Sequence, residues 1–221
     1  MNKSPATTKT PRPRVATPHE VQHVPSQQRA TVTTAGVAAA GSAPPDALDD
    51  AASLLASDHC IGSAHAKWLL LEYGDYECPS CREAEPLVRH LLDMFGSRMK
   101  FVFRHYPLEQ HPHAELAAEA AEAAAAQDKF WPMHRWLLAH GHGLLPEDLA
   151  RAAAQVGLNM HRYSAAMAEH AGRARVQEHR RSGQEIGLRG SPTFFLNGRL
   201  IDVSFGLEHL ESAVRASLGD D

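Results

Sequence analysis

The stretch that most constrains this chain covers residues 69–81, which read as a strand, a short loop and the start of a helix. The apolar run at 68–71 together with Tyr73 suits a buried strand, and Gly74 and Asp75 interrupt it. A helical pattern then begins at Cys78, within the sequence C-P-S-C. The sequence therefore predicts that Cys78 and Cys81 lie on the first turn of a helix that follows a strand.

This placement favours redox chemistry at the two thiols. The first helical turn offers unpaired backbone N–H groups and the positive end of the helix dipole, and both favour a thiolate over a thiol. We therefore expect Cys78 to be the attacking thiolate and Cys81, one turn further along, the resolving thiol. Pro79 suits the first turn, because the N–H that it lacks would have had no partner there. A disulfide closing so short a loop adds little chain-entropy stabilisation, which favours reversible exchange over a structural role.

These residues resemble the DsbA-like family of thioredoxin-fold proteins. The matching segments are Asp58, His59 and Gly62, then Glu72 through Pro79, the run Phe-Trp-Pro-Met-His at 130–134, and Gly190 through Gly198. The resemblance covers about residues 56 to 219, which is the size of a full domain. It implies an α/β thioredoxin fold with an all-helical insertion, and a protein thiol–disulfide oxidoreductase or isomerase that acts on protein dithiols and disulfides. No bound cofactor and no metal is implied.

The expected organisation follows from periodicity and breakers along the chain. We expect an N-terminal tail at 1–55, the first part of the thioredoxin fold at 56–107, a helical insertion at 108–188 and the second part at 189–219. In the first part, a strand at 68–73, a helix at 79–95 ended by Gly96 and a strand at 99–105 form a β-α-β unit with parallel strands. A short edge strand or turn at 58–62 precedes them, and a short helix is expected at 46–56.

The later elements are predicted in the same way. Helices are expected at 113–127, at 129–140, from Pro146 onward and across 161–185, with no strand signal among them. Asn197-Gly198 between apolar runs at 193–196 and 199–203 predicts a hairpin with a type I′ turn, and an amphipathic helix at 207–218 closes the chain.

The resemblance also implies roles for residues around the cysteines. Glu72 corresponds to a buried carboxyl that handles the proton of the inner cysteine, although strand period alone leaves a solvent-facing carboxylate open. Pro192 corresponds to a cis-proline beside the cysteine pair, which leaves the backbone of Ser191 free to pair with an extended substrate. Ser191 and Ser80 are expected to tune the reduction potential, and Pro79 and Ser80 to contact substrate.

Other functions remain open from the residues alone. The two cysteines could be part of a metal-binding or chaperone-like module, together with Cys60, although the chain has three cysteines and lacks the fourth that a zinc site of paired C-x-x-C motifs would use. A glutathione-conjugating or peroxide-reducing module would need a single reactive cysteine and gives Cys81 no purpose. Cys60 itself is expected to be a half-buried free thiol, with a third exchanging cysteine as the alternative.

Two groups of residues receive structural interpretations. The chain has 15 histidines, including close pairs at 111 and 113 and at 140 and 142, but neither pair has the i, i+4 spacing of a helical metal site. We therefore interpret the histidines as surface composition. An aromatic stripe formed by Phe130, Trp131, Met133 and Trp136 could line a substrate groove, but is expected to belong to the core.

Composition limits partners and location. The net charge of −4 gives no basic excess to attract nucleic acid, and no apolar run is long enough to span a bilayer. Residues 1–50 are rich in Thr, Pro, Ser and Ala and are expected to be disordered. Basic residues near the N-terminus suggest an export signal, but the stretch at 30–43 makes a poor hydrophobic region, so a cytoplasmic location is favoured over a periplasmic or secreted one. The redox partner, the oligomeric state and the direction of exchange are not specified by the sequence.

Overall fold

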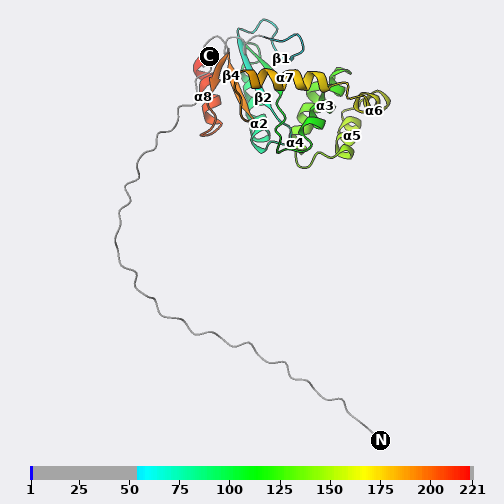
Figure 1. The fold of residues 1–221 in the computed structure, drawn as a ribbon. Coiled ribbons are helices and arrows are strands. Elements are labelled where there is room, and N and C mark those ends of the chain that lie inside the picture. The colour runs from blue at the N-terminus through cyan, green and yellow to red at the C-terminus, as the bar shows by residue number, and fades with distance from the viewer. Residues whose placement is uncertain (2–53, 220–221) are drawn as a thin grey trace. The chain divides into compact units, whose positions relative to one another are not determined.

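The computed structural model describes Met1 and residues 54–219, which build a five-stranded mixed sheet covered by helices (Figure 1). The strands are β1 (His59–Gly62), β2 (Trp68–Gly74), β3 (Met99–His105), β4 (Thr193–Leu196) and β5 (Arg199–Ile201). Their order is β1-β3-β2-β4-β5, so β2 is central as predicted, and β1 is the expected edge strand. β2 runs parallel to β3, and the remaining pairs are antiparallel.

Helix α2 (Pro79–Phe95) connects the parallel strands and packs on one face of the sheet, as predicted. Its apolar positions recur at helical spacing, so Ala84, Val88, Leu91 and Phe95 all become buried, and Gly96 follows as the C-cap. Helix α8 (Glu208–Leu218) lies beside α2 on this face and contributes Leu210, Val214 and Leu218 to the same core. A smaller apolar cluster on the opposite face consists of Leu71, Tyr73, Val102, Tyr106 and Phe195.

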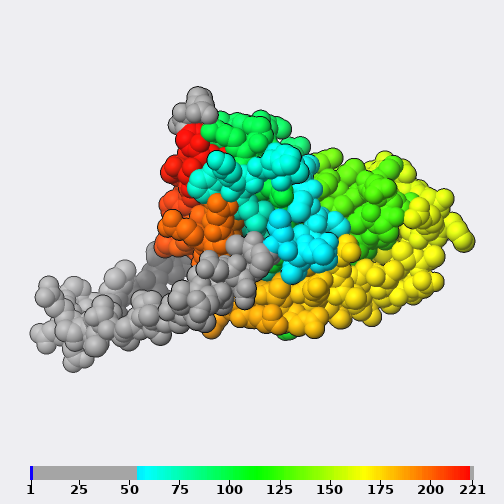
Figure 2. Space-filling view, turned by 90° about the horizontal axis from the view of Figure 1, so that it is seen from above, coloured from blue at the N-terminus to red at the C-terminus, as the bar shows by residue number. Residues whose placement is uncertain are grey.

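Five helices lie between β3 and β4 and confirm the predicted all-helical insertion. They are α3 (Ala114–Ala125), α4 (Phe130–His140), α5 (Pro146–Gln155), α6 (Met160–Ala168) and α7 (Arg173–Glu185). Alanine-rich α3 lies in the middle and contacts each of the other four, because its small side chains allow close approach. Figure 2 shows α5 in yellow-green and α6 in yellow at the opposite end of this folded part from α8 in red.

The hairpin formed by β4 and β5 is also confirmed. Asn197 and Gly198 have φ values of 46° and 78°, which are the positive angles that a type I′ turn requires at both central positions. The Asn197 side chain accepts a hydrogen bond from the Leu69 N–H at 2.7 Å, which ties the turn to the start of β2. The second strand ends at Ile201 rather than at residue 203, because Asp202 and Val203 leave the ladder.

A glycine allows α7 to lie against the sheet. A Cβ atom at Gly183 would come within 2.7 Å of Tyr106 Cε2 and 3.2 Å of Tyr73 Cε1, both closer than ordinary packing. The neighbouring Ser182 shares a hydrogen bond with the Tyr73 hydroxyl at 3.0 Å.

Two expectations fall largely outside the described part of the chain. The tail at 1–50 is not described beyond Met1, and of the predicted helix at 46–56 only residues 54–56 are described, which are not helical. Among the described residues, no helix has the length and apolar character to cross a bilayer.

Candidate active site

The backbone of one loop residue holds both cysteines where β2 leads into α2. Cys78 is the N-cap of α2, with φ −70° and ψ 121°, and Pro79 is the first helical residue. The Cys78 N–H donates to the Asp75 carbonyl oxygen at 3.2 Å, and the Asp75 N–H donates to Cys81 Sγ at 3.4 Å. Both thiols are free, and the side chain of Cys78 lies closer to the surface than that of Cys81.

The pKa values of the two thiols are shifted in opposite directions from that of a free thiol. A hydrogen bond from Cys81 lowers the pKa of Cys78 to about 5, in spite of burial, with further help from Ser191 and from the backbone N–H groups of Ser80 and Cys81. Burial raises the pKa of Cys81 well above that of a free thiol, and the charges of Cys78 and Glu72 raise it further. This difference supports the predicted division into an attacking and a resolving thiol.

The segment that precedes β4 meets the cysteines directly. Cys78 Sγ donates to the Ser191 carbonyl oxygen at 3.3 Å, and the Ser191–Pro192 peptide bond is cis, as expected. The Ser191 hydroxyl is buried and has no hydrogen-bond partner among the described residues while Cys78 is a thiol, so it is available to a thiolate there. Pro79 and Ser80 are exposed beside Cys78, whereas Ser191 and Pro192 are half-buried.

Glu72 faces the interior, so the solvent-facing alternative is wrong. It lies two residues after Leu70 in β2 and therefore on the same sheet face, the one that α2 covers, with 2% of its surface exposed. Burial raises its pKa well above the usual value, and the charges of Glu85 and Cys78 raise it further. Its Oε1 atom has no hydrogen-bond partner among the described residues.

Two histidines hold the loop that precedes Cys78, which corrects their interpretation as surface composition. His111 Nδ1 lies 2.8 Å from Asp75 Oδ2, which also accepts the Leu108 N–H at 2.8 Å. His113 Nδ1 lies 3.1 Å from Glu77 Oε1, and its backbone N–H donates to Glu77 Oε2 at 2.7 Å. The sequence offered one signal for this arrangement, because the carboxylates at 75 and 77 and the histidines at 111 and 113 have the same spacing of two residues. It gave no indication that the two segments meet.

Three further histidines are buried, so the surface interpretation is wrong for them too. His105, His134 and His179 each have at most 1% of their surface exposed. Burial lowers the pKa of His134, and it lowers that of His179 to about 2, so both rings are neutral near pH 7. A neutral imidazole packs like a small aromatic ring while keeping a hydrogen bond, as His134 Nδ1 does with the Tyr76 hydroxyl at 3.2 Å.

The remaining predicted residues have structural surroundings. Cys60 is exposed rather than half-buried, because its side chain lies on the face of β1 opposite to that of the partly buried His59 and Ile61. Its Sγ lies 3.8 Å from the Asp58 carbonyl oxygen. Phe130 and Met133 are buried in the main core, which supports the core interpretation of the aromatic stripe. Trp131 and Trp136 are partly buried at its edge.

Comparison with known proteins identifies what this arrangement is similar to. A family model described as Thioredoxin matches residues 55–216. A thioredoxin-like oxidoreductase from Silicibacter pomeroyi DSS-3 superposes with a TM-score of 0.67 at 26% identity, covering 80% of this chain and 100% of that one. The thiol-disulfide exchange protein alpha-DsbA2 from Wolbachia pipientis has a TM-score of 0.66 at 18% identity, covering 74% and 88%. Oxidised BdbD from Bacillus subtilis has a TM-score of 0.66 at 20% identity, covering 73% of this chain and 92% of that one.

The curated relatives carry a different name. The chain is 43% identical over 161 residues to a protein named Na(+)/H(+) antiporter NhaA 1 from Salinispora arenicola, which covers 72% of this chain and 24% of the relative. It is 36% identical over 160 residues to Na(+)/H(+) antiporter NhaA from Herminiimonas arsenicoxydans, covering 72% and 25%. The chain thus spans about a quarter of the length of the curated relatives that it matches.

Proposed function

Because the chain belongs to the thioredoxin family and has a DsbA-like fold, we propose that it is a thiol–disulfide oxidoreductase acting on proteins through Cys78 and Cys81. The observation that carries this proposal is that two thiols on one helical turn have pKa values shifted in opposite directions. A pKa of about 5 makes Cys78 a thiolate near neutral pH, while the raised pKa of Cys81 keeps it protonated until it is needed.

The exchange proceeds in two balanced steps. The Cys78 thiolate attacks one sulfur of a substrate disulfide, so that a mixed disulfide forms and the other substrate sulfur leaves as a thiolate. Cys81 then loses its proton and attacks Cys78 Sγ, which releases the second substrate thiolate and leaves a Cys78–Cys81 disulfide. The substrate is reduced and the pair oxidised, and the reverse sequence oxidises a substrate dithiol. Glu72, with its raised pKa, would take and return the Cys81 proton through water.

Substrate recognition is proposed at the surface around Cys78. The Ser191 backbone beside Cys78 Sγ would pair with an extended substrate segment, and Pro192 would hold that backbone in place. Pro79 and Ser80, exposed next to Cys78 in the chain, would contact the same segment. These four residues thus surround the attacking thiol with main-chain groups and small side chains, which suits varied protein substrates.

The test is dithiol exchange with a disulfide-bonded model peptide, followed by trapping of free thiols. We expect Cys78→Ala to lose exchange and Cys81→Ala to accumulate the mixed disulfide, while Cys60→Ser, the matched control, keeps full activity. Full exchange by Cys78→Ala would refute the proposal. Metal analysis of protein purified without chelator would then decide whether the cysteines hold an ion instead.

The direction of exchange can be argued from the same thiol. Stabilising the Cys78 thiolate stabilises the reduced pair, which makes the disulfide form a stronger oxidant. We therefore infer a disulfide donor, a role that suits an oxidising compartment better than the cytoplasmic location favoured by the sequence. Equilibration with glutathione buffers measures this: a potential near about −120 mV supports a donor, and one near about −270 mV indicates a reductase.

A second candidate role concerns the partner. The curated relatives named as Na(+)/H(+) antiporters contain a segment like this chain that makes up about a quarter of their length. We infer that an antiporter of this class is among the protein partners of the present chain. A Cys81→Ala variant, expressed in the native host, would trap such a partner as a mixed disulfide in the membrane fraction. Failure to recover an antiporter, while other trapped proteins are recovered, would remove this candidate.

A further inference from the structure

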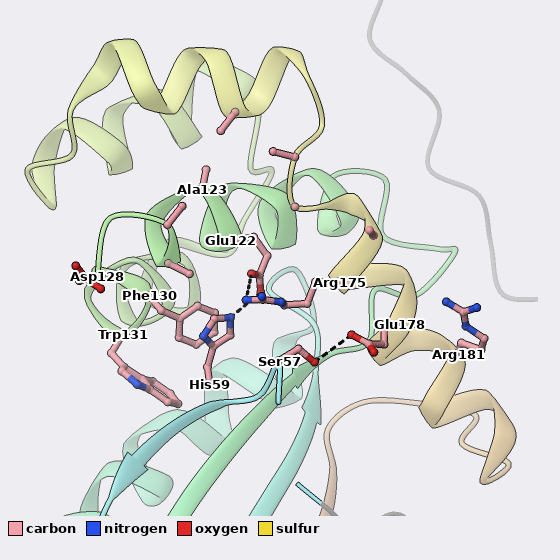
Figure 3. A pocket seen from close by; sticks show the side chains of 16 residues that line it. Ser57, His59, Glu122, Ala123, Asp128, Phe130, Trp131, Arg175, Glu178 and Arg181 are labelled. Carbon is pink, nitrogen blue, oxygen red and sulfur yellow. Dashed lines mark hydrogen bonds and ion pairs between the residues drawn. The ribbon is translucent and has the colours of Figure 1, made fainter. Parts of the chain in front are cut away.

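Three potential metal ligands from three different elements meet away from the cysteines. They are His59 on β1, His105 at the end of β3 and Glu122 on α3. The Nε2 atoms of His59 and His105 each lie 2.7 Å from the same atom, Glu122 Oε1, and all three ligand atoms lie within 4.8 Å of one another. Figure 3 shows His59, Glu122 and Arg175 pointing toward one another at the wall of a cavity.

We propose that His59, His105 and Glu122 form a binding site for a divalent transition-metal ion such as Zn²⁺. Two imidazoles and one carboxylate are a donor set that Zn²⁺ and Fe²⁺ take in proteins with one or more positions left open, whereas Mg²⁺ and Ca²⁺ prefer oxygen alone. The proposal does not rest on the exchange function, because none of these residues belongs to the cysteine site.

The ligands are held in place before any ion binds. The His59 ring stacks on Phe130 with centroids 3.6 Å apart and 15° between the planes, and the His105 side chain is almost completely buried. Arg175 contacts the other carboxylate oxygen, Glu122 Oε2, at 3.0 Å, which leaves Oε1 to the imidazoles. Such outer contacts orient a ligating carboxylate.

The surroundings leave room for an ion to enter. A cavity of about 940 Å³ reaches His59, Glu122, Phe130 and Arg175 from the solvent side (Figure 3). Ligand atoms about 2.0–2.2 Å from a tetrahedral ion lie about 3.3 Å apart, so each 2.7 Å contact must open by roughly 0.6 Å. A small rotation of the Glu122 carboxylate about its contact with Arg175 would supply a movement of that size.

One feature limits the expected affinity. Binding through Nε2 places the ring proton of His105 on Nδ1, an atom that is buried and has no partner among the described residues. Metal-bound histidines usually donate that proton, and loss of such a contact costs about 10- to 100-fold in affinity. We therefore expect a dissociation constant on the order of micromolar, weaker than that of a typical structural zinc site.

The experiment uses the full chain, without an affinity tag, with all three cysteines replaced by serine so that no thiol competes. Zn²⁺ is titrated against a chromophoric chelator, and one equivalent is expected to bind. Both Glu122→Gln and His59→Ala should weaken binding at least about 100-fold, because each removes a ligand rather than an outer contact. His161→Ala, a change at an exposed histidine on α6, is the matched control and should leave binding unchanged.

Two readouts keep the proposal falsifiable if a variant is unstable. Far-UV circular dichroism establishes that each variant is folded before titration, and imidazole nitrogen shifts in the otherwise unaltered protein report binding without any ligand substitution. Zn²⁺ should shift Nε2 of both His59 and His105 while leaving His161 unaffected. No binding, binding that persists in folded Glu122→Gln, or shifts spread over the exposed histidines would each overturn the proposal.

Discussion

Glu72 and Glu122 are both buried carboxyl groups within one small domain, yet their acidities move in opposite directions. Glu72 has 2% of its surface exposed and Glu122 has 6%. Burial raises the pKa of Glu72, with help from the nearby charges of Glu85 and Cys78. Burial would also raise the pKa of Glu122, but contacts with His105 and His59 outweigh it and hold that pKa low. The difference lies in the partners rather than in the depth.

The comparison separates two uses of a buried acid. Glu122 is fully engaged by two imidazoles and a guanidinium, so it stays ionised and links β1, β3 and α3. Glu72 has an oxygen without a partner and lies beside the thiols, so it is free to change protonation during exchange. An unpaired buried carboxyl such as Glu72 reduces the stability of the folded protein, whereas a paired one such as Glu122 supports it, and variants of the two residues test this difference.

The largest expected effect is the loss of the paired acid. Glu122→Ala should lower the free energy of unfolding by about 3 kcal/mol at pH 7, because it leaves two buried or half-buried imidazoles without their acceptor. The folded-state pKa of Glu122 is depressed, so this contribution is present above the unfolded pKa and is lost as pH falls through the acid range. Urea unfolding at pH 7 and pH 3 measures it, and an equal loss at both values would contradict the assignment.

The unpaired acid should behave in the opposite way. Glu72→Gln should raise the free energy of unfolding by about 2 kcal/mol at pH 8, because the folded protein no longer has to keep a carboxyl protonated. Since the folded-state pKa is raised, the parent protein loses stability as pH rises above the unfolded pKa, and the variant should not. The same variant should resolve mixed disulfides more slowly. A destabilised variant with unchanged kinetics would show that Glu72 is a packing residue.

The pairs in the active-site loop provide an intermediate case. His111→Gln should destabilise the protein by about 1 kcal/mol, because the Asp75 carboxylate loses its contact with the His111 ring but still accepts from the Leu108 and Glu77 N–H groups. Asp75 also donates its N–H to Cys81 Sγ, so the rate at which Cys81 resolves the mixed disulfide should change as well. Thermal unfolding and single-turnover exchange measure the two effects. A stability loss with an unaltered resolving rate would limit His111 to a structural role.

The smallest expected effect concerns the attacking thiol. Alkylation of Cys78 by iodoacetamide should follow a titration centred near pH 5, with Cys81 unreactive over the same range. Ser191→Ala should raise the pKa of Cys78 by roughly a few tenths, since one of several hydrogen-bond donors is removed. Ser80 was expected to tune the thiol as Ser191 does, but its backbone N–H rather than its hydroxyl serves the thiolate. Ser80→Ala keeps that N–H, so as the matched control it should leave the titration unchanged. A midpoint near that of an ordinary thiol would contradict the proposed activation.

Local patterns explain why much of the sulfur site could be predicted from the sequence. The apolar run in β2, the break at Gly74 and the proline after Cys78 are signals within a few neighbouring residues, and they predicted the strand, the loop and the helix start. The face of Glu72 could not be fixed in this way, because strand period gives two opposite choices. Packing of Leu70 under α2 makes the choice, and that contact is not a local property.

The histidine site could not be predicted because its members are brought together by the fold alone. His59 lies 63 residues and His105 lies 17 residues before Glu122 in the sequence. The two histidines lie on strands and Glu122 on a helix, and no spacing rule predicts that these elements meet. The same reasoning explains the error at Cys60. The sequence predicted an edge strand or turn at this position, but which face of that strand other elements cover is decided by the fold, and the face that carries Cys60 is left exposed.

The close contact at Gly183 has a consequence for local opening of the fold. Helix α7 carries Ser182 beside Tyr73, His179 beside the His105 N–H, and Arg175 beside Glu122, and it approaches the sheet only because residue 183 lacks a Cβ atom. A single methyl group there would lift all three contacts together. Amide hydrogen exchange at His105 would then speed up, so a glycine outside the histidine site would set how often that site becomes accessible to water.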